Sequence, residues 1–251
     1  MFNRRSRAHT DPIEKANRKK DQEFLSTYIQ LTLPTIRCRI SSLKEEKTNL
    51  LFNFPPQHSG GHAQWTNKWR HPKTGDEYGL VLMRAEDMTD PDLTSCLDMI
   101  DLTSGQDYRN SSMGWDREGK LAEMKSPGLR YILVRDGGGA IAAFTSFMPT
   151  YEEGQPVLYC YEIHLLDRVR KSGLGTLLMG YLCNIASTLP PITKVMLTCF
   201  TSNNGARAFY EQMGFVTDDI SPRPRVLRGG RETRAPDYLI LSKVVERLTC
   251  G

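Results

Sequence analysis

The sequence predicts an α/β domain, and two observations predict it. From residue 78 onward, apolar runs of strand length are separated by turn residues such as the Asp-Gly-Gly-Gly of 136–139. The order of the predicted elements is a series of strands followed by strand, helix, strand, helix and strand. Such an order is typical of a layered α/β or α+β domain.

Length and composition limit the class of protein. The 251 residues, 39% of them hydrophobic, suffice for one domain with extensions. No apolar run approaches the roughly 18 residues of a membrane span, and the basic start of the chain does not resemble a secretory signal. The six cysteines form no CxxC or His/Cys cluster, which argues against a zinc site or a disulfide framework. We therefore expect no metal, no membrane association and a reducing compartment, the nucleus and cytoplasm.

Three segments are predicted along the chain. Residues 1–20 carry seven Arg or Lys and are predicted to be a flexible basic arm, or alternatively a nuclear-import or nucleic-acid patch. Residues 21–76 are predicted to be a helical extension and a loop, and 77–245 the main domain. Apolar spacing predicts a helix over 12–33 that ends at Pro34, with a second short helix over 39–50. The Pro-Pro and Gly-Gly pairs in 53–76 favour a long loop.

The elements of the main domain follow in order. A strand over 78–84 precedes a helix over 91–102, for which Asp90 is the expected N-cap because Pro91 suits the first turn. Strands over 129–135 and 140–148 form a hairpin, and a third strand covers 157–165. Apolar residues at helical spacing predict a helix over 174–185. The remaining expected elements are a strand over 194–200, a helix over 203–213 and strands over 214–217 and 238–242.

The junction between the strand 157–165 and the helix that follows it predicts an anion site. Its sequence, Arg170-Lys-Ser-Gly-Leu-Gly175, places glycines and basic residues at the start of a helix. Glycine lets the backbone approach a phosphate closely, and the N–H groups at a helix N-terminus bind anions. The Gly-Lys-Ser/Thr of a Walker-type P-loop is absent.

This junction resembles the R/Q-x-x-G-x-G/A signature of the GNAT acetyltransferases. A second match, Asn203-x-x-Ala-x-x-Phe-Tyr210-x-x-x-Gly-Phe215, follows at the spacing that the fold expects. The resemblance implies the GNAT fold, a central mixed and mostly antiparallel sheet flanked by helices, here with an N-terminal helical extension. It also implies acetyl-CoA as the acetyl donor. The implied cofactor-binding residues are Ile163, His164, Leu165, Arg170, Lys171, Ser172, Gly173, Leu174, Gly175, Thr176, Asn203 and Tyr210.

Four segments narrow the resemblance to the N-alpha-acetyltransferase D (NatD) family: Leu-Tyr-Cys-Tyr-Glu at 158–162, the loop 170–175, Lys-Val-Met-Leu-Thr at 194–198 and Asp-Asp at 218–219. The likeness extends from about residue 78 to 243. That family acetylates the N-terminal serine of histone four and histone two-A, which both begin Ser-Gly-Arg-Gly. The resemblance implies histone tails as substrate, and substrate contacts from Tyr108, Trp115, Tyr159, Tyr161, Thr198, Tyr238 and Glu152. We expect a monomer, although the sequence itself does not determine the oligomeric state. Glu153, Asp218 and Asp219 are further candidates for the acid that binds a substrate arginine.

Glu162 is the predicted catalytic base, because it is the catalytic position of the family pattern. It lies in an otherwise apolar and aromatic strand, where an unpaired carboxylate is costly and its pKa should rise. Regular alternation would place Cys160, Glu162 and His164 on one face of the strand, unless a bulge reassigns the faces. His164 is a rival base, and Cys160 as an acyl-carrying nucleophile is a third option.

Two other functions stay open. The chain could be a GNAT enzyme for lysine or another amine, or a non-catalytic protein that binds CoA. The loop 221–235 departs from the family pattern, since it holds five Arg and one acid. This loop and the basic arm predict at most a weak contact with nucleic acid.

Overall fold

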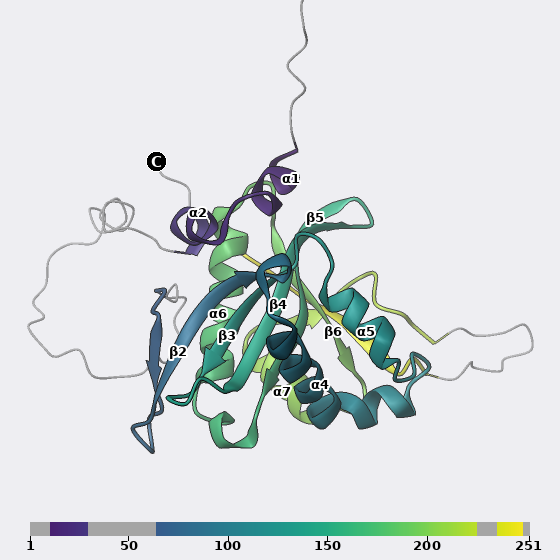
Figure 1. Ribbon diagram of the computed structural model, residues 1–251. Coiled ribbons are helices and arrows are strands. Elements are labelled where there is room, and N and C mark those ends of the chain that lie inside the picture. The colour runs from purple at the N-terminus through teal and green to yellow at the C-terminus, as the bar shows by residue number, and fades with distance from the viewer. Residues whose placement is uncertain (1–10, 30–63, 225–234, 248–251) are drawn as a thin grey trace, which may run out of the picture.

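The described part of the chain is built on one mixed sheet (Figure 1), and the computed structural model describes residues 11–29, 64–224 and 235–247. The sheet has eight strands in the order β1-β2-β3-β4-β5-β6-β8-β7. These strands are β1 (Lys68–Arg70), β2 (Glu77–Arg84), β3 (Arg130–Arg135), β4 (Ile141–Glu152), β5 (Gln155–Leu165), β6 (Lys194–Phe200), β7 (Val216–Thr217) and β8 (Tyr238–Val244). All neighbours run antiparallel except β5 and β6, which are parallel. The predicted mixed, mostly antiparallel sheet is therefore confirmed.

Helices cover both faces of the sheet. The α-helices of the described residues are α1 (Pro12–Asn17), α2 (Asp21–Phe24), α4 (Asp90–Asn110), α5 (Arg117–Met124), α6 (Leu174–Thr188) and α7 (Asn204–Gln212). One turn of π-helix, η1 (Leu25–Ile29), follows α2, and two 3-10 turns are η2 (Ala85–Asp87) and η3 (Asp167–Val169). In Figure 1, α4 and α5 lie in front of the sheet and α6 behind it. None of the described helices is long and apolar enough to cross a membrane.

Strand β3 shows how the two layers divide the core. Its Ile132 and Val134 belong to the apolar cluster under α6, whereas Tyr131 and Leu133 belong to the cluster under α4 and α5. Successive side chains of a strand point to opposite faces, so a continuous apolar run suits a strand buried on both sides. The run over 129–135 therefore folds as a central strand, as predicted.

The N-terminal segment differs from the single predicted helix over 12–33. Arg130 of β3 is fully buried, and its guanidinium donates to the carbonyl of Lys19 and, at 3.3 Å, to that of Asn17. It also forms an ion pair of 2.7 Å with Asp21. The helix breaks between α1 and α2, where the backbone is extended at Lys20 and the carbonyls before it bond to this arginine.

The structure differs from other predicted elements as well. Residues 30–33 and the predicted helix over 39–50 lie outside the described residues. The predicted loop over 53–76 contains β1, which pairs with β2. Helix α4 continues to Asn110, and its N-cap is Thr89, which accepts from the Asp92 N–H at 3.2 Å, rather than Asp90. Helix α5 was not predicted, and the domain limits as a whole stay a prediction.

Candidate active site

A cavity of about 370 Å³ lies where β5 and β6 separate. The two strands pair only through Leu158–Cys160 and Val195–Leu197, after which β5 stays with β4 and β6 with β8. Because parallel strands with a helical crossover leave a crevice at their carboxyl ends, a site is expected at this edge. Ten of the predicted site residues line the cavity: Tyr108, Glu152, Tyr159, Tyr161, Glu162, Ile163, His164, Thr198, Asn203 and Tyr210.

A β-bulge in β5 sets which side chains reach the cavity. Ser146 of β4 pairs with Glu162, and the next residue, Phe147, pairs with Cys160, so Tyr161 is an extra residue in β5. The Thr145 hydroxyl donates to the Glu162 carbonyl at 2.9 Å and fixes the backbone there. An extra residue reverses the alternation of faces beyond it.

The bulge places Tyr161, Glu162 and His164 on one face of the sheet. Tyr161 packs in the cluster under α4 and α5, and His164 contacts Thr103 of α4. Cys160 and Ile163 instead belong to the cluster under α6. The expectation that Cys160, Glu162 and His164 share one face is therefore wrong, for the reason that was anticipated, a bulge.

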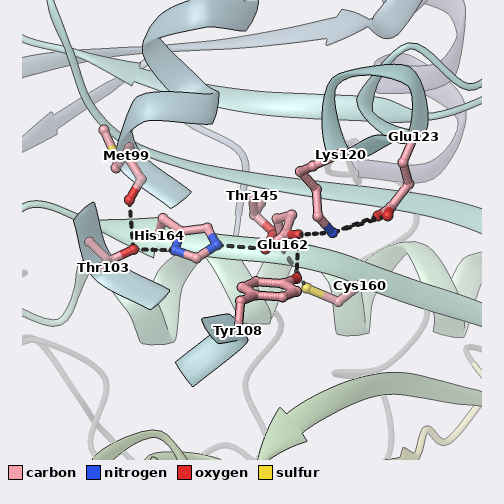
Figure 2. Close-up of polar contacts among 9 residues, drawn as sticks. All are labelled: Met99, Thr103, Tyr108, Lys120, Glu123, Thr145, Cys160, Glu162 and His164. Carbon is pink, nitrogen blue, oxygen red and sulfur yellow. Dashed lines mark hydrogen bonds and ion pairs between the residues drawn. The ribbon is translucent and has the colours of Figure 1, made fainter. Parts of the chain in front are cut away.

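Both carboxylate oxygens of Glu162 are held (Figure 2). Oε1 lies 3.0 Å from the Lys120 ammonium and accepts from the Tyr108 hydroxyl at 3.4 Å. Oε2 lies 2.6 Å from Nε2 of His164. Partners from α4, α5 and β5 thus fix the orientation of one carboxylate that is only 7% exposed.

The ionisation of Glu162 differs from the expectation for an unpaired carboxylate. Burial raises its pKa, but the hydrogen bond and charge of His164 and the charge of Lys120 outweigh burial, so the pKa of Glu162 is lowered from its ordinary value. The predicted rise is wrong because the carboxylate is paired. Glu162 is therefore ionised at neutral pH.

His164 is held from its other side by α4. Its Nδ1 lies 2.5 Å from the Thr103 hydroxyl, which also donates to the Met99 carbonyl at 2.8 Å. The chain Met99, Thr103, His164 and Glu162 is continuous in Figure 2. Both ring nitrogens are thus engaged, which fixes the ring and makes it a partner of Glu162.

Lys120 of α5 completes the group of charges. Its ammonium lies 3.0 Å from the carboxylate of Glu123 and 5.0 Å from the centre of the Tyr108 ring. Burial lowers the pKa of Lys120, but the adjacent Glu162 carboxylate outweighs burial and the pKa is raised. Lys120 is therefore charged. Sequence reasoning missed Lys120 and Glu123 because the short, polar helix α5 gave no clear periodic signal.

The Cys160 thiol is unsuited to carry an acyl group. Burial raises its pKa to about 12, so the thiolate is not populated at neutral pH. Its nearest polar contacts are the Thr145 hydroxyl and the Glu162 carbonyl, each at 3.6 Å, and neither is a base for a thiol. The structure therefore disfavours the third mechanistic option.

Aromatic side chains form the walls of the cavity. The Tyr159 hydroxyl lies 2.6 Å from that of Thr198, and the Tyr159 and Tyr161 rings are 5.1 Å apart. Burial raises the pKa of Tyr108 and of Tyr159 to about 12, so both are neutral hydrogen-bonding groups. Trp115 packs on the Tyr108 ring at 5.4 Å but does not line the cavity.

Of the remaining predicted substrate residues, some line the cavity and others do not. Tyr238 pairs with Phe200 in the sheet and lies outside the cavity lining, whereas Glu152 and the unpredicted Glu123 belong to it. Asp218 is nearly buried and forms an ion pair of 2.7 Å with Lys194, so its carboxylate is already engaged in the fold. Glu152 and Glu123, which also pairs with Lys120 but is 43% exposed, are thus the lining acids besides Glu162 that could meet a cationic substrate.

The glycine-rich loop lies beyond the cavity, where β5 leads through η3 into α6. Lys171 has φ 54° and Gly173 has φ 85°, a left-handed backbone that turns successive N–H groups to one side. Gly173 is the N-cap of α6, and no side chain caps this end. A Cβ on Gly175 would lie 3.4 Å from the Phe209 ring, so a larger residue would crowd α7. Residues 170–176 do not line the cavity, but their backbone and charge suit a phosphate group.

Two predicted cofactor residues have definite local roles. Asn203 is the N-cap of α7, because its side-chain oxygen accepts from the Ala206 N–H at 3.0 Å. Tyr210 lines the cavity, and burial raises the pKa of its hydroxyl well above the ordinary value, so this hydroxyl is neutral. No cluster of His, Cys, Asp and Glu in the described residues could hold a metal ion.

Comparisons with known proteins agree with this geometry. Residues 96–215 match the sequence model of the acetyltransferase (GNAT) family. Over 155 residues the chain is 37% identical to N-alpha-acetyltransferase 40 of Saccharomyces cerevisiae, which covers 53% of this chain and 54% of the yeast protein. The chain thus spans about half the length of that curated relative.

Solved structures align with about two thirds of the chain at low identity. Arabidopsis thaliana NAA60 with a bisubstrate analogue aligns at 14% identity and a TM-score of 0.46, over 66% of this chain and 98% of that one. Arabidopsis thaliana Naa50 with a bisubstrate analogue aligns at 15% identity and a TM-score of 0.43, over 65% and 97%. Similarity at this level does not extend to activity or substrate.

Proposed function

We propose that this chain, whose fold is that of the GNAT acetyltransferases, transfers an acetyl group from acetyl-CoA to the α-amino group of protein N-termini. One observation carries the proposal. The buried Glu162 carboxylate is ionised, fixed at both oxygens and directed to a cavity walled by tyrosines. The similarity to yeast N-alpha-acetyltransferase 40 supports the choice of an α-amino group.

The chain offers a path for acetyl-CoA along the free edge of β5. Among the described strands, none pairs with residues 162–165 of β5 on the side of β6. The Glu162 and Leu165 carbonyls accept from the side chains of Thr145 and Arg170, and the other backbone groups on that side are available for the amides of a pantetheine arm. The loop 170–176 then lies where a pyrophosphate would follow. When bound, acetyl-CoA supplies a thioester carbonyl to the cavity.

The energetics favour a weak base. An α-ammonium of pKa about 7.7–8 needs only about 1 kcal/mol to deprotonate at pH 7, against about 4.6 kcal/mol for a lysine of pKa about 10.4. Glu162 accepts the amine proton, directly or through water, as the new C–N bond forms. Tyr210 donates a hydrogen bond to the thiolate as the C–S bond breaks. A carboxylate with a lowered pKa suits an N-terminus better than a lysine.

The finer part of the proposal concerns the substrate. We infer that the protein acetylates Ser-Gly-Arg-Gly N-termini, those of histone four and histone two-A. The four matching sequence segments support this, and so do Glu123 and Glu152, which give the cavity negative charge for a substrate arginine. We also propose that the protein acts as a monomer in the nucleus and cytoplasm, with weak nucleic-acid contact through its basic arm.

A peptide assay tests both parts. The protein is incubated with acetyl-CoA and three peptides: Ser-Gly-Arg-Gly without lysine, the same peptide blocked at its N-terminus with one lysine added, and Ser-Gly-Glu-Gly. We expect turnover of the first alone. Equal turnover of the free and the blocked peptide refutes N-terminal specificity, and equal turnover of the Arg and Glu peptides refutes the proposed substrate sequence. Tight CoA binding without turnover of any peptide would favour a non-catalytic role.

A further inference from the structure

Lys120 is a buried cation that the proposed mechanism does not use. Its side chain is 9% exposed, and lysine is rarely so buried unless it is paired. Lys120 lies on helix α5, and its side chain lines the cavity between α4 and β5. A lysine at such a position needs an explanation beyond solubility.

The contacts of Lys120 converge on Glu162. The ammonium lies 3.0 Å from Glu162 Oε1 and 3.0 Å from each oxygen of Glu123, and it sits over the Tyr108 ring (Figure 2). Glu123 is 43% exposed, so water screens it, whereas Glu162 is screened little. The stronger electrostatic coupling is therefore that between Lys120 and Glu162.

The other groups around Glu162 carry at most one compensating positive charge. The titratable groups that face it are Lys120 and Glu123 from α5, Tyr108 from α4, Tyr131 from β3, Cys160 and His164 from β5, and Tyr210 from α7. The tyrosines and the cysteine are neutral at pH 7, and His164 is charged only if it is protonated. Lys120 is thus the one permanent cation of this group.

We propose that Lys120 is a positioning residue, which keeps the Glu162 carboxylate ionised and oriented toward the substrate amine. This inference rests on the proposed function, in which Glu162 is the base. His164 and Lys120 both lower the pKa of Glu162, but only Lys120 is charged whatever the protonation of the imidazole. A buried carboxylate that loses this charge takes up a proton more readily, and a protonated Glu162 could not accept one from an amine. A fixed ammonium on Oε1 and a fixed imidazole on Oε2 also hold the carboxylate plane at the cavity lining.

Two substitutions separate charge from size. Lys120→Gln keeps a hydrogen-bond donor but removes the charge, whereas Lys120→Arg keeps the charge. Lys125→Gln is the matched control, because Lys125 ends the same helix, is 48% exposed and pairs with Asp90 at 3.3 Å outside the cavity. The measurement is the pH dependence of kcat/KM with acetyl-CoA and the Ser-Gly-Arg-Gly peptide.

The acid limb of this profile distinguishes positioning from a structural role. A nearby opposite charge lowers a carboxyl pKa by about 1 to 3 units. The substrate amine sets the upper part of this limb, and the slope of log kcat/KM steepens at the lower pH where Glu162 takes up a proton. Lys120→Gln should therefore move this Glu162 break up by about 1 to 3 pH units, while Lys120→Arg and Lys125→Gln should leave it in place. A Lys120→Gln profile with the wild-type Glu162 break overturns the proposal, and so does an equal shift in Lys120→Arg.

A second readout needs no turnover. Without the charge of Lys120, the pKa of Glu162 rises and the folded state binds a proton that the unfolded state releases, so the melting-temperature difference from wild type grows from pH 4 to pH 7. When Lys120→Gln is made in a Glu162→Gln protein, the melting-temperature difference between that double variant and Glu162→Gln should not grow with pH. A difference that still grows from pH 4 to pH 7 contradicts the coupling between Lys120 and Glu162. If wild type acetylates no amine, the proposed function fails, yet this measurement still decides whether Lys120 keeps Glu162 ionised.

Discussion

Replacing Glu162 with Gln is the substitution that bears most directly on the chemistry. The amide has the size of the carboxylate, and it can rotate so that its oxygen accepts from Lys120 and Tyr108 while its NH2 faces His164. Lys120 keeps Glu123 at 3.0 Å. We therefore expect a folded protein that loses about 1 to 3 kcal/mol of unfolding free energy, the cost of a weakened buried hydrogen bond to a charge.

The loss of kcat, expressed as a transition-state free energy, should exceed the loss of unfolding free energy. A positioned general base contributes about 10² to 10⁴ in rate, which corresponds to about 3 to 5 kcal/mol of transition-state free energy. Because the loop 170–176 lies beyond the cavity, the Kd for acetyl-CoA should not change. Steady-state release of CoA thiol with the Ser-Gly-Arg-Gly peptide measures kcat and KM, and titration calorimetry measures the Kd. Glu211→Gln on the exposed face of α7 is the control, since Glu211 is 62% exposed.

The pH dependence of kcat/KM is a second test of Glu162 as the base. Because the pKa of Glu162 is lowered from 4.5, the base is already ionised at pH 6. The wild-type kcat/KM should therefore rise between pH 6 and 8 with the free amine of the peptide, whose pKa is about 7.7–8. Glu162→Gln should keep that slope at a much lower rate. A Glu162→Gln rate within tenfold of wild type would refute the reasoning and favour His164 as the base.

Three further substitutions test parts of the fold that support the site. Thr103→Val removes the hydroxyl at 2.5 Å from His164 Nδ1; it should cost about 1 to 3 kcal/mol in thermal unfolding and lower kcat more than KM. Gly173→Ala forces a side chain into φ 85°; it should cost about 1 to 2 kcal/mol and weaken acetyl-CoA binding in calorimetry. Asp21→Asn leaves the buried Arg130 without its carboxylate; it should cost about 3 to 5 kcal/mol in chemical unfolding, yet leave kcat unchanged at low temperature.

The sequence predicted the elements whose patterns are local. Strands β2, β3, β5 and β6 and helix α6 lie where apolar runs or helical spacing indicated them. The periodic pattern of apolar residues failed where a segment contacts a residue that is distant in the sequence. At the break between α1 and α2, the guanidinium of Arg130, more than one hundred positions away, donates to carbonyls of the segment. A periodicity within 12–33 cannot contain that information.

The second half of α4 was missed for a different reason. Residues 103–110 are mostly polar, and the face they turn to the sheet carries Thr103 and Tyr108, whose hydroxyls meet His164 and Glu162. A helix that lines a polar site lacks the apolar stripe by which helices are found in a sequence. The same holds for α5, which contributes Lys120. The two helical stretches that the sequence did not predict thus both contribute side chains to the site.

The bulge at Tyr161 joins fold and chemistry. Without it, a regular strand with Tyr161 on the face of α4 and α5 would turn Glu162 toward the cluster under α6, on the face of Cys160. A carboxylate there would meet apolar side chains and would be protonated, because no cation would offset its burial. With the extra residue, two tyrosines and Glu162 reach the same cavity, where Lys120 and His164 hold the charge. One inserted residue, fixed by the hydroxyl of Thr145, therefore decides whether the carboxylate at position 162 can act as a base.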